Sequence, residues 1–133
     1  MAIQLSVATR NARLEAIETT IGGTAVLKIF NGSIPANCAA ADAGTALAVM
    51  TLAADWKAAA SGGSAVLAGT WQDACADAAG TATYFRLYAN GGTVCGMQGT
   101  VAQGSGDLSL DNTVIAAGQQ VNVTTFTLTD GNA

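Results

Sequence analysis

The sequence predicts a mainly β fold: a single-domain antiparallel β-sandwich, jelly-roll-like or immunoglobulin-like, preceded by an N-terminal α-helix. Three observations predict it. One helix-periodic segment opens the chain, about seven short alternating segments follow, and Gly-rich turns separate them. A length of 133 residues suits one domain with its own core. We assign residues 1–133 to one domain, with the helix in 1–23 and the β-sandwich in 24–133.

The opening segment, IQLSVATRNARLEAIETTIGG, predicts the helix. Its apolar side chains recur near a 3.6-residue period and would form one buried stripe: Ile3, Val7, Leu14, Ile17 and Ile21. Ser6 or Thr9 is suited to cap the start of the helix. Gly22 and Gly23 supply a stop, because glycine adopts the left-handed backbone that ends many helices.

The strands follow in order. Residues 24–30, TAVLKIF, alternate, and NGSIP then turns the chain. The Ala-, Gly- and Ser-rich stretch 36–70 contains two short candidate strands, ALAVMTL and SAVLAG. Between them, AADWKAAASGG is either a helical turn or an ordered loop, and frequent glycines favour extended segments over helix in this stretch.

The strongest local pattern is a β-hairpin. Residues 82–88 alternate, Asn90-Gly91 suits a tight turn, and TVCGMQGTV returns. Gly96 and Gly99 in the return strand indicate a bulge or a close backbone approach. GSGDLSLDNTVI then gives another strand and turn, and residues 120–129 form the last strand.

Composition excludes several function classes. With a formal net charge of −4 and five basic residues, the chain has no basic patch for nucleic acid. Its apolar runs fall far short of the ~20 residues needed to span a bilayer, and its start does not resemble a secretory signal. We therefore expect neither nucleic acid nor membrane as a partner. The three widely spaced cysteines, Cys38, Cys75 and Cys95, are expected to be reduced thiols.

No pattern of catalytic residues is present. The sequence contains no histidine, no C-x-x-C pair and no phosphate-binding glycine loop. We expect no enzymatic activity, no cofactor and no resident metal. Two weaker alternatives stay open. Asp42, Asp73 and Asp77 are either solvated loop aspartates or ligands of a hard cation.

The second alternative concerns aromatic side chains. Trp56 and Trp71 in loops, and Tyr84 and Tyr88 on one strand face, are either core anchors or a platform for a sugar.

The chain is unusually poor in charge. Charged residues make up 11% of the sequence, under half of the roughly 25% usual for globular domains. The segment 112–129 has no charged side chain, and uncharged polar groups tolerate burial in a protein interface better than ions do. We therefore expect much of the surface to contact other subunits. The candidate contacts are Met1, Ile3, Leu5, Val7, Arg10, Trp56, Val121, Val123, Phe126 and Leu128.

Arg10 falls near the apolar stripe of the predicted helix. Its guanidinium either extends past the stripe to water or reaches a carboxylate of a neighbouring subunit.

Four segments resemble a group of small structural proteins of tailed bacteriophages and prophages: LSVATRNARLEAIETTIG, DWKAAASGG, GTWQDACADAAGTATYFRLY and LDNTVIAAGQQVNVTTFTLTDGNA. The resemblance covers nearly the whole chain. It implies a virion component assembled in the bacterial cytoplasm, and within that class a capsid decoration (cement) protein. The implied partners are copies of itself, with a trimer favoured, and the major capsid protein or other virion subunits. A tail or neck subunit is the alternative, and a carbohydrate or host-recognition module is the rival from another class.

Overall fold

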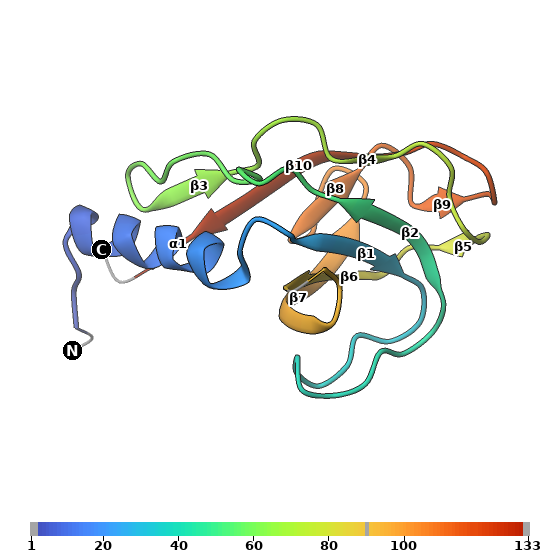
Figure 1. Ribbon diagram of the computed structural model, residues 1–133, viewed down its shortest axis with the longest axis horizontal. Coiled ribbons are helices and arrows are strands. Elements are labelled where there is room, and N and C mark those ends of the chain that lie inside the picture. The colour runs from blue at the N-terminus through green and yellow to red at the C-terminus, as the bar shows by residue number, and fades with distance from the viewer. Residues whose placement is uncertain (1–2, 90, 132–133) are drawn as a thin grey trace.

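The computed structural model describes residues 3–89 and 91–131. One helix, α1 (Val7–Ile21), precedes ten strands within these residues. Figure 1 shows α1 beside β3 and the end of β10, beyond one end of the sheet. The prediction of a mainly β protein with one N-terminal helix is confirmed. The strands are β1 (Val26–Phe30), β2 (Ala46–Thr51), β3 (Ser64–Val66), β4 (Gln72–Asp73), β5 (Gly80–Thr81), β6 (Tyr84–Ala89), β7 (Val94–Ala102), β8 (Leu108–Leu110), β9 (Val114–Ile115) and β10 (Val121–Thr129).

Helix α1 begins and ends at the predicted signals but is shorter than the predicted range 1–23. The Ser6 side chain accepts a hydrogen bond from the Thr9 backbone N–H at 3.2 Å, which caps the first turn. Gly22 ends the helix at φ +87°. Leu14 and Ile21 are buried as predicted. Ile3, however, lies before the helix and is exposed, so it does not extend the buried stripe.

Eight strands form one sheet in the order β2-β1-β6-β7-β8-β10-β3, with β4 also paired to β10, and β5 and β9 form a separate ribbon. Paired strands run antiparallel except β7 and β8, which are parallel at Val101 and Ala102. The large sheet curls into a mixed half-barrel (Figure 1). The described residues therefore do not form the two facing antiparallel sheets that the sequence predicts, because β8 and β10 continue the same sheet from β7.

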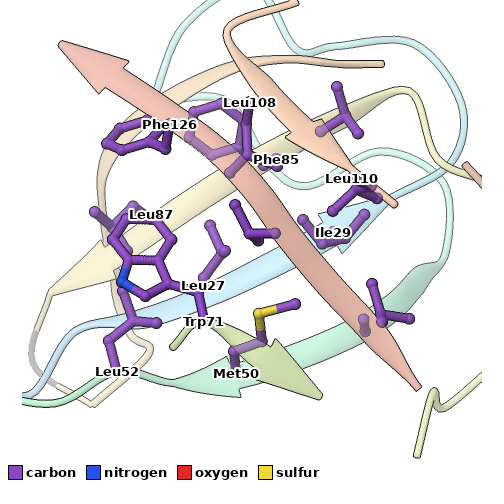
Figure 2. Packing of buried hydrophobic residues seen from close by; sticks show 14 of the residues in the cluster. Leu27, Ile29, Met50, Leu52, Trp71, Phe85, Leu87, Leu108, Leu110 and Phe126 are labelled. Carbon is purple, nitrogen blue, oxygen red and sulfur yellow. The ribbon is translucent and has the colours of Figure 1, made fainter. Parts of the chain in front are cut away.

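The core fills the inside of this curl, where β10 crosses β6, β1 and β2 (Figure 2). Phe126 of β10 contacts Trp71 and Phe85, with ring centroids 5.1 and 5.9 Å away. Edge-to-face and tilted contacts of this kind are the favoured geometries for buried aromatic rings. The aromatic side chains therefore join the two sides of the curl.

Strand β10 changes face partway along its length. Its pairing with β8 has a register shift between Val123 and Thr125. A bulge of this kind moves the following side chains to the other face. Val121 and Val123 before it and Phe126 after it are consequently all buried. The simple alternation expected from the sequence would have divided these three residues between opposite faces.

The outer face of β1 and β6 carries a second, smaller cluster, beneath loop 31–45. Phe30 and Tyr84 stack with ring centroids 4.9 Å apart, and Val26 and Tyr88 are buried beside them. The Tyr84 hydroxyl accepts a hydrogen bond from the Ala43 N–H at 3.0 Å. Loop 31–45 thereby closes the face that water would otherwise reach.

The predicted hairpin is confirmed as β6 and β7. Asn90, the first predicted turn residue, lies outside the described residues, and Gly91 follows it at φ +69°. Leu87 pairs with Met97 and Tyr88 with Cys95, so Gly96 is the extra residue of a β-bulge. The bulge prediction at Gly96 is also confirmed.

Candidate assembly surface

A groove runs between α1, β7 and β10. It consists of three cavities of about 520, 410 and 280 Å³, and Ile17 lines all of them. We call this surface the α1 groove. It is lined by Arg13, Leu14, Ala16, Ile17, Thr20 and Ile21 of α1, Val94, Cys95, Gly96, Met97 and Gln98 of β7, and Thr127, Leu128 and Thr129 of β10, with Phe85, Ala89, Asp107, Phe126 and Asp130 at its margins.

The groove exists because β8 is short. β8 lies between β7 and β10, but its three residues pair with Val101 and Ala102 of β7 and with the Val123–Phe126 part of β10. No strand of the described residues continues between Gly96–Gln98 and Thr127–Thr129, which line one cavity. Gly96 also brings α1 close, since a Cβ there would lie 2.7 Å from Ile21 Cγ1. The floor of the groove is therefore apolar and backbone-rich.

Charged groups at the margins of the groove are already paired within the chain. Arg13 Nε lies 3.1 Å from Asp130 Oδ2. Asp107 Oδ2 accepts hydrogen bonds from the Thr100 N–H at 2.8 Å and the Thr100 hydroxyl at 3.0 Å. The floor between them carries uncharged residues of β7 and β10. An occupant of this groove would therefore meet one internal ion pair and the Asp107 carboxylate, which is hydrogen-bonded but keeps its negative charge.

Arg10 turns inward instead of reaching outward. It is buried, and its Nη1 donates to the Asp130 backbone oxygen at 3.2 Å. Gly63 makes room for the guanidinium: its φ is +79°, and a Cβ there would lie 2.1 Å from Arg10 Nη1. The burial of Arg10 differs from both alternatives left open by the sequence, water or a neighbouring carboxylate.

Polar contacts attach α1 to the segment 57–60. The buried Lys57 Nζ lies 3.1 Å from Glu15 Oε1, which also accepts a hydrogen bond from the Ala60 N–H at 2.6 Å. The Lys57 N–H donates to Glu18 Oε2 at 2.9 Å. The Ala60 hydrogen bond, followed by the Lys57 contact, lowers the pKa of Glu15. These contacts fix one wall of the groove, and no pattern in the sequence predicts them.

The predicted assembly contacts separate into two groups. Met1 lies outside the described residues. Ile3 is 80% exposed and Val7 48% exposed, Leu5 is half-buried, and Leu128 is half-buried in the α1 groove. The remaining residues are side chains of the chain's own interior and are not presented to a neighbour: Arg10, Trp56, Val121, Val123 and Phe126. Trp56, expected in a loop and a candidate assembly contact, is instead buried, and its Nε1 donates to the Gly22 oxygen at 3.1 Å beneath the helix end.

A polar cluster that the sequence did not reveal holds loop 31–45. Arg86 of β6 is buried and lies 2.8 Å from Asp42 Oδ1. It also donates to the Ala40 and Asn37 oxygens, at 2.9 and 3.0 Å. The Tyr88 hydroxyl donates to the same Asp42 oxygen, and burial raises the pKa of Tyr88. This cluster fastens the loop to the sheet.

Cys38 and Cys95 lie beside this cluster and line the same small cavity. All three cysteines are free thiols. Burial, followed by a hydrogen bond with Cys38, raises the pKa of Cys95 to about 12. The Cys95 thiol is therefore protonated at neutral pH, which makes it a poor nucleophile.

The possible cation and sugar sites do not assemble. Asp42 binds Arg86, whereas Asp73 accepts hydrogen bonds from the Val49 and Cys75 N–H groups, both at 3.0 Å. Across residues 3–89 and 91–131, no group of three acidic or cysteine side chains is placed to hold a metal ion. The four candidate aromatic residues are all buried: Trp56, Trp71, Tyr84 and Tyr88.

Comparison with known proteins gives no relative: no family model, no curated protein and no solved structure matches this chain. Among the described residues, no helix has the length and apolar character required to cross a membrane.

Proposed function

We propose that the chain is a structural subunit of a tailed-bacteriophage virion, and within the particle a capsid decoration protein. It is assembled in the bacterial cytoplasm and stabilises the head lattice through non-covalent contacts. Its partners are copies of itself, as a trimer, and the major capsid protein. The sequence resemblance to small phage structural proteins supports this proposal.

The observation that carries the proposal is the placement of the basic side chains. Arg10, Lys57 and Arg86 are buried. The remaining two are also engaged: Arg13 pairs with Asp130, and Lys28 Nζ lies 4.6 Å from the centre of the Tyr88 ring. Scattered surface charge of both signs keeps independent proteins apart in solution. An exterior with so few free cations is suited to coverage by other subunits.

The α1 groove adds a second argument. It is an apolar depression beside exposed aliphatic side chains, among them Val94, which is 51% exposed. Burying such area stabilises a subunit contact by about 25 cal/mol per Å² before entropic costs. A lattice multiplies this contribution over many identical contacts.

The test is the composition of purified particles. Virions from a host carrying this chain, separated on a density gradient and analysed by mass spectrometry, should contain it at a copy number comparable with the major capsid protein. Free phage tails from the same lysate are the matched control. Absence of the chain from particles would remove the proposal. Presence in tails but not in heads would move the chain to the tail or neck.

A further inference from the structure

The sheet has an empty strand position. β8 separates β7 from β10 where it is present, and it begins at Leu108, which pairs with Val101 on one side and Phe126 on the other. Gly96–Gln98 and Thr127–Thr129 continue past that point and line a common cavity of about 410 Å³. Since β8 fits between the two strands, their separation there equals two strand spacings, about 9.5 Å. Just before Leu108, where β8 begins, the opening between β7 and β10 is therefore wide enough for one strand.

The β7 side of this opening offers backbone hydrogen-bonding groups. The Thr100 N–H points toward the β8 side of β7, because it donates to Asp107, which precedes β8. N–H groups of alternate residues in a strand point the same way, so the Gln98 N–H is directed into the opening. An extended peptide is the ligand that uses such edges, by adding a strand.

One segment of the chain has the complementary properties. Residues 3–6, IQLS, precede α1 without secondary structure, and Figure 1 shows this stretch running away from the rest of the molecule. Ile3 is 80% exposed, and no residue from 3 to 9 is charged. In a strand, Ile3 and Leu5 share one face. That face would meet the apolar lining of the opening, to which the half-buried Met97 and Leu128 contribute.

Residues 3–6 are too short to occupy the opening of their own chain. This segment leaves the N-terminal end of α1, whereas the β7 side of the opening lies beside Ile17 and Ile21. Residues 7 and 17 of a helix are about 15 Å apart along its axis, at 1.5 Å per residue. Four extended residues span about 13 Å, at 3.3 Å each. Residues 3–6 therefore cannot fold back and lie along β7.

We infer that residues 3–6 of a second copy of this chain dock as an added strand in the α1 groove, between β7 and β10. The inference rests on the proposed function, because it names the partner and the contact in self-assembly. The contact joins two different surfaces of the subunit. Such contacts close as a ring when the rotation between subunits permits it, and a trimer is the ring that we expect.

The first experiment measures self-association of the full chain by sedimentation velocity at micromolar concentrations. Ile3→Asp places a charge where the segment meets the apolar floor, and should weaken association at least tenfold. The matched control is Ile34→Asp in loop 31–45, where Ile34 is 42% exposed, and it should associate like the wild type. Thermal unfolding of both variants should match the wild type, since both side chains are exposed.

The second experiment places the segment. Ile3→Cys combined with Thr127→Cys, in a Cys75→Ser background, should form a disulfide between chains on mild oxidation with oxidised glutathione. Peptide mapping should join residue 3 of one chain to residue 127 of another. Ile3→Cys with Val114→Cys is the control and should stay unlinked, because Val114 is exposed on β9, away from the groove.

The outcomes separate this inference from the proposed function. A wild-type chain that is monomeric, or an oligomer that Ile3→Asp leaves intact with no link between residues 3 and 127, overturns strand docking. Neither result bears on the proposed virion function, which the composition of purified particles tests separately. If the chain forms the predicted disulfide but is absent from particles, strand docking stands and the proposed virion function is overturned. If the wild-type chain is monomeric and Ile3→Asp abolishes its binding to particles, residues 3–6 bind a groove in another virion protein. Docking between copies of this chain is then overturned.

Discussion

Strands β6 and β7 form one hairpin, yet their surroundings differ completely. All six residues of β6 are buried, including Arg86. In β7, residues 94–98 are exposed or partly covered, with Val94 51% exposed, and buried positions occur only from Gly99 onward. The difference lies in what the chain places across each strand. The core covers the inner face of β6 and loop 31–45 covers its outer face, whereas residues 94–98 of β7 face the α1 groove.

This comparison shows that burial of a strand is set by distant covering segments as much as by its own side chains. Loop 31–45 is held over β6 by Arg86, Asp42 and the Tyr84 hydroxyl. β8 pairs with the edge of β7 at Val101 and Ala102 and is too short to continue along residues 96–98. The α1 groove is the part of the sheet that β8 leaves open, and it is where we propose that another subunit docks.

The largest loss of stability should come from truncating a buried side chain of β6, compared with truncating its half-buried cross-strand partner in β7. Leu87 of β6 pairs with Met97 of β7; Leu87 is fully buried and Met97 half-buried. Leu87→Ala should lower the free energy of unfolding by about 3 kcal/mol, through lost burial and the cavity that remains. Met97→Ala should lower it by about 1 kcal/mol, because part of that side chain already contacts water. Urea unfolding measures both, and equal losses would contradict the comparison.

The next effect concerns the cover over β6. Arg86→Met keeps the buried stem but leaves two carbonyl groups without this donor, and the Asp42 carboxylate with the Tyr88 hydroxyl in place of its ion pair. We expect a loss of about 2 kcal/mol, below the full penalty for a broken buried pair, because the Asp42 side chain is 40% exposed and can hydrate.

Arg13→Met is the control for Arg86→Met. Its ion pair with Asp130 is more exposed, and its loss should cost about 0.5 kcal/mol. Faster hydrogen exchange across residues 36–43 in Arg86→Met would confirm that the loop has lost its anchor. Unchanged exchange there would show that other contacts hold the loop.

A smaller effect should follow from filling the bulge of β7. The Cβ in Gly96→Ala would lie 2.7 Å from Ile21 Cγ1, so helix α1 or the strand must shift. We expect a loss of about 1 kcal/mol and weaker self-association, since the groove changes shape. Gly131→Ala is the control, because nothing lies within 4 Å of its added Cβ. A Gly96→Ala chain that unfolds and associates like the wild type would mean that α1 is loosely held.

The smallest effect should appear under acid. Glu15 has a pKa lowered from its usual 4.5, so its ionised form stabilises the fold. That contribution is present above pH 4.5 and is lost as the pH falls through the lowered pKa of the folded state. Glu15→Gln should therefore flatten the decline of stability below pH 4.5, measured by urea unfolding from pH 3 to 7. Asp55→Asn, at an exposed position, should keep the wild-type profile.

Local signals in the sequence predicted the local structure. The Ser6 cap, the Gly22 stop, the hairpin and the Gly96 bulge each depend on neighbouring residues, and all four are present. The last strand was expected over residues 120–129 and is found at Val121–Thr129. These features follow from backbone preferences, which a single sequence records.

Long-range features could not be predicted in the same way. The bulge in β10 that brings Val121, Val123 and Phe126 to one side has no glycine to mark it. The parallel pairing of β8, the Arg86–Asp42 anchor and the Lys57–Glu15 contact join segments far apart in sequence. Of the candidate surface, Ile3, Val7 and Leu128 could be found as apolar residues near the ends of elements. The α1 groove depends on the length of β8 and could not.

The placement of lysine and arginine has a consequence for survival outside a cell. Trypsin-like proteases cleave after these residues and require an extended, accessible stretch of substrate. Arg10 and Arg13 lie in α1, Lys28 in β1, Arg86 in β6, and Lys57 in a β-bridge with Leu67. Within residues 3–89 and 91–131, no cleavage site of this specificity falls in an open loop, so digestion has to wait for unfolding. The protein should persist in trypsin-rich surroundings for as long as it stays folded.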